Sequence, residues 1–191
     1  MNRATLRFFL AAASAVCSQA APVLNLLPAT GSVSGSPGAA VGWGFTLTDS
    51  TPSEWVILTG SQFTGSPIFG AYVDYLSSNS APTYVVGPAP ENSTIQAAWN
   101  RSTMAGLGEF DINSTAGLVS VPGNIVVHYS VFSADPLSPN FNPDTATVLA
   151  DAAVSVPAQV NITPEPGSAW IISALLPLAW WWRRRAIARR S

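Results

Sequence analysis

The stretch that decides the fold of this chain reads Gly38-Ala39-Ala40-Val41-Gly42-Trp43-Gly44-Phe45-Thr46-Leu47-Thr48. Every second residue from Val41 to Leu47 is large and apolar, and the residues between them are glycine or threonine. Because successive side chains of a β-strand point to opposite faces, this alternation predicts a strand with one buried and one open face.

The same period of two returns in two later segments. It runs through Ile125, Val127, Tyr129 and Val131, and again through every second residue from Val154 to Ile162. Shorter apolar runs bounded by turn residues predict further strands at 54–59, 69–76, 83–87, 94–100 and 118–121. About eight short strands at loop-length spacing predict an all-β fold, namely an antiparallel β-sandwich of the immunoglobulin-like kind.

Residues 38–48 also resemble the first core strands of immunoglobulin-like modules in bacterial surface proteins. The chain departs from antibody domains in one respect, because it lacks the pair of cysteines that joins their two sheets. We therefore expect a sandwich that is stable through packing alone.

Charge is scarce and unevenly placed in this chain of 191 residues. Charged residues make up 9% of the sequence, and there is no lysine. In residues 21–163 one arginine, Arg101, stands against nine acids, which gives this body a net charge of −8. A body with one such cation cannot neutralise a phosphate backbone, so nucleic-acid binding is excluded.

The first twenty residues have the features of a secretory signal peptide. Arg3 and Arg7 give a basic start, residues 8–16 are apolar, and Ser18 and Ala20 stand at the small-x-small positions of a cleavage site. We predict a short signal helix and cleavage by signal peptidase after Ala20. The body then spans residues 21–163.

The only cysteine, Cys17, raises the alternative of a lipoprotein. A lipobox needs a small residue before the cysteine, and Val16 is too large, which favours cleavage after Ala20. Cleavage there removes Cys17, so the mature protein has neither a disulfide nor a thiolate ligand. With one histidine left, we expect no zinc site and no cofactor.

The C-terminus has three parts in a fixed order. Prolines hold residues 164–168 extended, and an uncharged run of 14 residues follows at 169–182. As a helix that run spans roughly 21 Å, against about 30 Å for a bilayer core. The flanking residues nevertheless favour a short transmembrane helix, because tryptophans suit the membrane interface and arginines stay on the cytoplasmic side. These flanking residues are Trp180, Trp181, Trp182, Arg183, Arg184 and Arg185.

This tripartite tail, residues 164–191, resembles the PEP-CTERM sorting signal of Gram-negative bacteria. The motif is Pro164-Glu165-Pro166, followed by the apolar run and an arginine-rich end at 183–191. The triple tryptophan departs from the usual helix composition. The resemblance implies recognition and removal of the tail by an exosortase. It also implies a surface or matrix protein of biofilm-forming bacteria that produce exopolysaccharide.

Two candidates for catalysis stand in the body. His128 is the only histidine and falls inside a predicted strand, and no Gly-x-Ser-x-Gly elbow accompanies it, so we interpret it as a structural strand residue. Glu109 and Asp111 are two apart and therefore share one strand face. Such a pair is compatible with a paired-carboxylate hydrolase or with ordinary exposed acids at a strand edge.

A loop rich in oxygen ligands spans residues 135–151. Asn140, Asn142 and Asp144 alternate as in a calcium loop, but Thr145 stands where that loop needs glycine. The same residue types build ordinary turns, so calcium binding and a rigid turn both remain open. We assign no metal site from the sequence.

Three tryptophans of the body are candidates for a sugar-stacking platform. Trp43 lies in an alternating apolar set and is expected in the core, and Trp55 falls in the predicted strand 54–59. Trp99, next to Asn100 and Arg101, is the candidate ligand contact.

The sequence therefore favours an exported, non-enzymatic protein of the cell envelope, cell surface or extracellular matrix, held transiently in the inner membrane by its tail. Its expected partners are signal peptidase, an exosortase and the membrane. The alternative is a carbohydrate-binding sandwich that recognises exopolysaccharide. A row of solvent-facing Trp and Tyr would favour that alternative.

Overall fold

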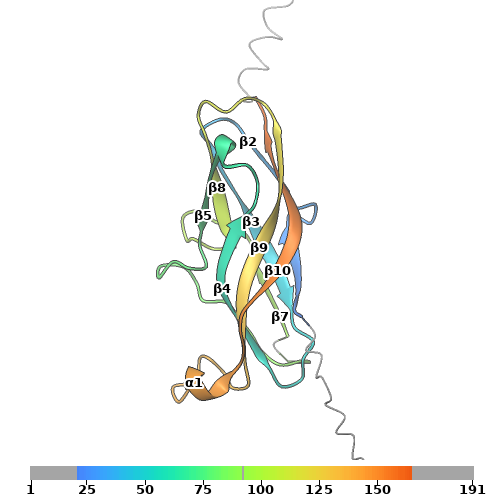
Figure 1. The fold of residues 1–191 in the computed structure, drawn as a ribbon, viewed down its shortest axis with the longest axis vertical. Coiled ribbons are helices and arrows are strands. Elements are labelled where there is room, and N and C mark those ends of the chain that lie inside the picture. The colour runs from blue at the N-terminus through green and yellow to red at the C-terminus, as the bar shows by residue number, and fades with distance from the viewer. Residues whose placement is uncertain (1–20, 92, 165–191) are drawn as a thin grey trace, which may run out of the picture.

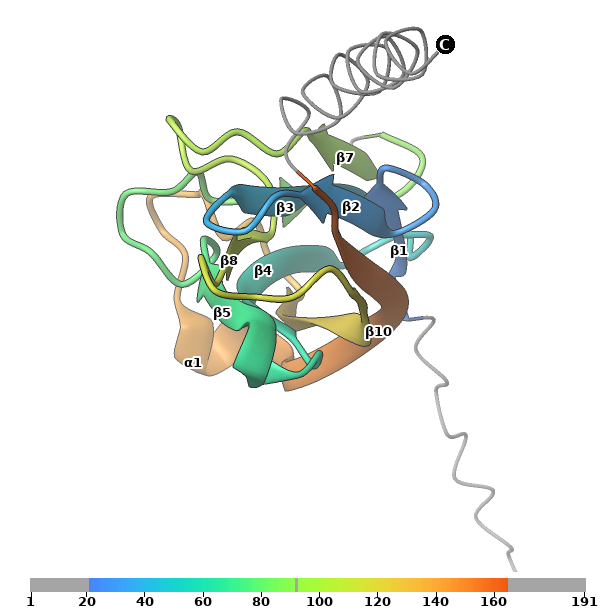
Figure 2. The same cartoon turned by 90° about the horizontal axis from the view of Figure 1, so that it is seen from above.

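The structure is a computed structural model, and it describes residues 21–91 and 93–164. Two five-stranded β-sheets pack face to face (Figures 1 and 2). The first sheet contains β1 (Val23–Leu27), β3 (Ala40–Thr48), β8 (Gly108–Ile112) and β5 (Gly70–Asp74), with β7 (Thr94–Ala97) also paired to β3. The second sheet has the order β2 (Ser32–Gly35), β10 (Thr147–Ile162), β9 (Ser120–Phe132), β4 (Trp55–Phe63) and β6 (Val85–Val86).

One apolar core fills the space between the sheets. The predicted buried face of β3 is confirmed, because Trp43, Phe45 and Leu47 are fully buried. The opposite face is not open along its whole length, since Gly42 and Gly44 are buried as well. From the second sheet, Ile125 and Val127 of β9 meet them, also without exposed surface. Each large apolar side chain buried in this way stabilises the fold by about 1.5–3 kcal/mol.

The N-terminal segment, residues 23–35, contributes one strand to each sheet. β1 pairs with β3 in the first sheet, and after a turn at Gly31 the chain enters the second sheet as β2. Gly31 has φ 67°, and a Cβ there would lie 2.5 Å from the carbonyl oxygen of Pro157. The Trp43 indole N–H donates to the Gly31 carbonyl at 2.8 Å, which ties this turn to the core.

The all-β prediction is confirmed, and the second sheet corrects one part of it. β2 runs parallel to β10, with Ser32 opposite Gln159 and Gly35 opposite Ile162, so this sheet is mixed and not wholly antiparallel. The parallel pair arises because the chain crosses between the sheets at Gly31 without forming a hairpin. The other pairings between strands of both sheets are antiparallel in the part of the chain that the structure describes.

The strand boundaries also differ from the sequence prediction. Residues 118–121 do not form a separate strand, since Ser120 and Val121 begin the 13-residue strand β9. The strand predicted at 94–100 ends at Ala97, because the following residues form a loop closed by a bridge between Asn100 and Ala105. Two short helical turns, η1 (Pro67–Phe69) and α1 (Pro143–Ala146), complete the described chain.

The predicted signal helix, residues 1–20, and the predicted transmembrane helix, residues 169–182, lie outside the described residues. Within residues 21–91 and 93–164, no helix is long and apolar enough to span a bilayer. The described chain ends beyond β10 at the top of Figure 1, whereas β1, the blue strand at the start of the colour range, lies lower in the molecule.

Candidate functional site

Strand β8 presents two acids on the outer face of the first sheet. Phe110 and Ile112 point into the core and are 2% and 4% exposed, so Glu109 and Asp111 point the opposite way. The predicted shared face of the two acids is thereby confirmed. The alternative of ordinary exposed acids at a strand edge does not hold for this pair, because β8 lies between β3 and β5 and Glu109 is buried.

The loop that follows β7 carries the arginine to this face. Asn100 and Ala105 exchange both backbone hydrogen bonds, at 2.9 and 3.0 Å. Inside this turn the Asn100 side-chain oxygen accepts the backbone N–H groups of Ser102 and Thr103. Asn100 therefore fixes the conformation of the loop at the position next to Arg101.

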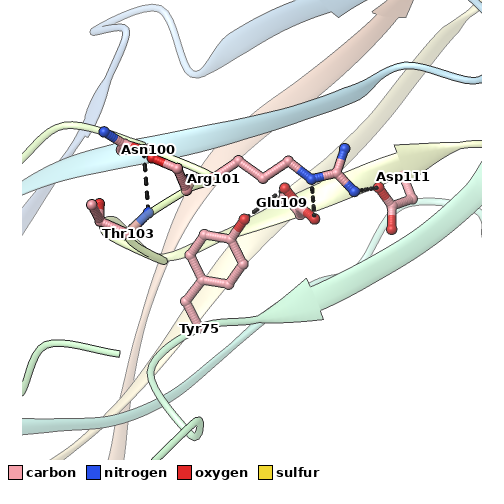
Figure 3. Close-up of polar contacts among 7 residues, drawn as sticks. Tyr75, Asn100, Arg101, Thr103, Glu109 and Asp111 are labelled. Carbon is pink, nitrogen blue, oxygen red and sulfur yellow. Dashed lines mark hydrogen bonds and ion pairs between the residues drawn. The ribbon is translucent and has the colours of Figure 1, made fainter. Parts of the chain in front are cut away.

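Arg101 bridges the two acids, as Figure 3 shows. Its Nε lies 3.4 Å from Glu109 Oε1, and its Nη2 lies 3.5 Å from Asp111 Oδ1. On the other side, the Tyr75 hydroxyl donates to Glu109 Oε2 at 2.6 Å. We call Tyr75, Arg101, Glu109 and Asp111 the Arg101 cluster.

The cluster compensates a buried negative charge. The Glu109 side chain is 6% exposed, and each of its oxygens faces a donor, which offsets the cost of removing a carboxylate from water. Burial, and then the hydrogen bond to the Glu109 carboxylate, raise the pKa of Tyr75 to about 12. Tyr75 is therefore a neutral donor at physiological pH.

Trp99 holds the same loop against the sheet. A Cβ at Gly42 would lie 2.2 Å from Trp99 Nε1, so the indole occupies the space that glycine leaves open on β3. Trp99 Nε1 is buried and has no hydrogen-bond partner among the described residues. The predicted ligand contact is thus half-buried and used in packing. The exposed part of this site is the Arg101 guanidinium with Asp111, whose side chains are 61% and 45% exposed.

The sequence analysis does not predict a second polar network, which links the two sheets. Ser61 of β4 is buried and lies 2.6 Å from Asp74 Oδ1, 2.7 Å from the Leu107 carbonyl oxygen and 2.9 Å from the Tyr72 hydroxyl. Burial raises the pKa of Tyr72 above its ordinary range. No local motif marks this network, because its members come from different strands and from a loop.

His128 does not join that serine and aspartate. Ser61 pairs with Val127, so both point into the core, and His128 is the next residue of β9 and points to the outer face. Ser61 and His128 thus belong to opposite faces of the second sheet, which is not the arrangement of a catalytic triad.

The three candidate tryptophans are separated. Trp43 is fully buried, and Trp99 packs on the outer face of the first sheet. Trp55 lines an open hollow of about 330 Å³ on the second sheet with Pro88, Pro90 and Glu91. Among the described residues, no Trp or Tyr is in the exposed class, so they form no single platform.

Segment 135–151 uses its polar side chains in turns. The Asp135 carboxylate accepts the Leu137 backbone N–H at 2.8 Å, and the Asn142 side chain caps α1 by accepting the Asp144 N–H at 3.0 Å. Across residues 21–91 and 93–164, no three His, Cys, Asp or Glu side chains gather into a group that suits a metal ion.

The predicted sorting motif begins at the end of the described chain. The Thr163 N–H donates to the Gly35 carbonyl at 2.9 Å, and Pro164 is exposed directly after it. The remaining predicted site residues lie outside the described residues: Ser18, Ala20, Glu165, Pro166, Trp180, Trp181, Trp182, Arg183, Arg184 and Arg185.

Comparison with known proteins gives no family for this chain. No protein-family model matches it, and no curated protein matches it. Among solved structures, WR4, a C. elegans MSP family member, is 10% identical, with a TM-score of 0.35 over 73% of this chain and 97% of that one. A chain of a dockerin–cohesin complex is 15% identical, with a TM-score of 0.27 over 75% of this chain and 100% of that one. At these TM-scores neither likeness carries an argument, so the fold class stands on the observed sheets.

Proposed function

We propose that this chain is an exported, non-enzymatic cell-surface or matrix protein that an exosortase sorts through its C-terminal signal. The order of the tail carries the proposal: an extended Pro-Glu-Pro motif, an apolar run and a terminal arginine cluster. The position of the motif supports it, because only Thr163 separates the last strand residue, Ile162, from the exposed Pro164. A membrane enzyme would meet the motif directly outside the folded body.

The proposal includes an immunoglobulin-like arrangement of the sandwich. An immunoglobulin constant-type domain has the strand order A-B-E-D in one sheet and C-F-G in the other. The orders β1-β3-β8-β5 and β4-β9-β10 support this assignment, with β8 as strand E and β5 as strand D. In that assignment β2, β6 and β7 are additions to the seven-strand plan.

The use of the polar groups supports a non-enzymatic role. Glu109 is held by Tyr75 and Arg101, and Ser61 is held by Asp74 and a backbone carbonyl. These contacts join strands and loops to one another, which is a structural use of these groups. A general acid or base needs instead a free position facing its substrate.

Carbohydrate binding is the second candidate, and one observation favours it. Arg101 and Asp111 expose a donor and an acceptor side by side on the first sheet, as sugar hydroxyl groups require. On the second sheet, the hollow beside Trp55 offers an aromatic edge and the Glu91 carboxylate. The two places lie on different sheets, so each would bind a short stretch of polysaccharide by itself.

A pair of tail variants tests the sorting proposal in a host that has an exosortase. Glu165→Ala removes the motif's carboxylate without altering the apolar run. We expect full-length protein to accumulate in the membrane fraction, while the control Glu91→Ala is processed like wild type. If Glu165→Ala is processed normally, the sorting proposal is wrong.

The arginine end is tested separately with Arg183, Arg184 and Arg185 replaced by Ser. Each arginine costs about 2.5–3.5 kcal/mol at the centre of a bilayer, so the three together fix the orientation of the tail. We expect unprocessed protein to leak from the envelope of this variant. Retention equal to wild type would contradict the proposed anchoring.

A further inference from the structure

A small cavity lies where the chain enters the sandwich. Its volume is about 60 Å³, which is ample for an ammonium group. Ala21 and Pro22 form one wall, and Asp49, Glu54 and Tyr129 supply its polar atoms. Apolar side chains of β4, β9 and β10 close the rest.

The strand register places the start of β1 next to Asp49. β1 and β3 pair antiparallel, with Val23 opposite Thr48. One further step along this register sets Pro22 opposite Asp49. Pro22 is buried but has no backbone N–H group to donate to β3. The pairing of β1 with β3 therefore does not extend to Ala21, which precedes the strand.

Asp49 is a buried carboxylate, and no cationic side chain of the described residues forms an ion pair with it. It is 1% exposed, and its two oxygens accept the backbone N–H and the hydroxyl of Thr51. Burial, and then the charge of Asp49, raise the pKa of Tyr129, which puts that charge next to the cavity. Arg101 is the only arginine or lysine in residues 21–164, and it contacts Glu109 and Asp111.

We propose that signal peptidase creates the missing cation, because cleavage after Ala20 gives Ala21 an ammonium group that binds Asp49 in this cavity. Water hydrolyses the peptide bond between Ala20 and Ala21, so Ala20 gains a carboxylate and Ala21 gains an amine. The amine takes up a proton at neutral pH, since an α-amino group has an ordinary pKa of about 7.7–8.0. Export thereby fixes the start of β1, and the uncleaved precursor lacks this ion pair.

The composition of the chain offers a direct assay. Because there is no lysine, the Ala21 amine is the only primary amine of a protein that begins at residue 21. An amine-reactive acetylating reagent therefore modifies this one site, and mass spectrometry gives the rate. An ammonium held by a carboxylate has a raised pKa. At a fixed pH below that pKa, a rise of one unit in the pKa lowers the fraction of reactive, unprotonated amine about tenfold.

The test compares processed wild-type protein from the envelope with Asp49→Asn and with Asp111→Asn. The control removes the same charge at the Arg101 cluster. We expect the amine of wild type and of Asp111→Asn to react about tenfold more slowly than that of Asp49→Asn at neutral pH. Equal rates for wild type and Asp49→Asn would overturn the ion pair.

Two further measurements keep the proposal falsifiable if Asp49→Asn does not fold. In wild type alone, the amine should react about tenfold faster in denaturing urea than in the native protein, and equal rates would overturn the proposal. N-terminal sequencing must begin at Ala21, and a start at a lipid-modified Cys17 would also overturn it. Neither result bears on the C-terminal tail, so a failure here is distinct from a failure of the sorting proposal.

Discussion

Two buried carboxylates of the body, Glu109 and Asp49, are stabilised in different ways. Glu109 lies between Arg101 and Tyr75, so the chain supplies its own cation and a phenol donor. Within residues 21–91 and 93–164, the side-chain oxygens of Asp49 accept hydrogen bonds only from Thr51. The comparison indicates that, on the outer face of the first sheet, folding alone gives the buried carboxylate its cation. The cavity at Asp49, in contrast, would be completed by cleavage during export.

The largest effect on stability should follow from removing the cation of the Arg101 cluster. Arg101→Met keeps an unbranched apolar stem but removes the guanidinium group, which leaves the Glu109 carboxylate with the Tyr75 hydroxyl. We expect the free energy of unfolding to fall by about 2–3 kcal/mol, measured by chemical denaturation, since a buried charge loses its partner.

The matched control for that variant is Asp111→Asn. Asp111 is half-exposed, and an ion pair in contact with solvent is worth about 0.2–1 kcal/mol. If the free energy of unfolding falls by the same small amount in both variants, Arg101 does not stabilise the Glu109 carboxylate. Glu109 and Asp49 would then differ less than their contacts indicate.

A smaller effect should appear at alkaline pH through Tyr75. Its pKa is raised from 10.0 to about 12 in the folded protein, so its contribution to stability is complete below pH 10 and is lost as the pH rises toward 12. For this residue the loss is about 1.4 kcal/mol between neutral pH and pH 11.

Comparison with Tyr75→Phe isolates this contribution. Tyr72 and Tyr129 also have raised pKa values and titrate in both proteins. We expect the unfolding free energy of the variant to fall less steeply above pH 10 than that of wild type. Parallel curves would show that folding does not raise the pKa of Tyr75.

The sequence predicts the core of this fold well, for a physical reason. β3, β9 and β10 are long strands with large apolar residues at every second position over much of their length, so their alternation is visible in the sequence. β1 and β2 are short, and the chain changes sheets between them at Gly31. That crossing depends on a backbone turn and on contacts with Pro157 and Trp43, which no local pattern contains.

The candidate site was predictable only in pieces. Trp99 and the pair Glu109 and Asp111 each stand out in the sequence, but nothing local shows that they meet. They meet because Gly42 pairs with Glu109 across β3 and β8, and because Gly42 leaves room for the Trp99 indole. The role of Asp49 depends in the same way on the register between β1 and β3.

No effect at all is expected from reductant. Cleavage after Ala20 removes Cys17, the only cysteine, so the mature protein should have the same melting temperature with and without a thiol reductant. A clear shift on reduction would show that Cys17 is retained and paired between chains, and that Ala21 is not the first residue.

The intact mass of the wild-type protein isolated from the cell surface tests the central claim most directly, because it reports both ends at once. The account predicts a chain that begins at Ala21 and has lost the apolar run and the arginine end. A mass that still includes Trp180 to Ser191 would contradict the sorting proposal and would make the tail a permanent anchor.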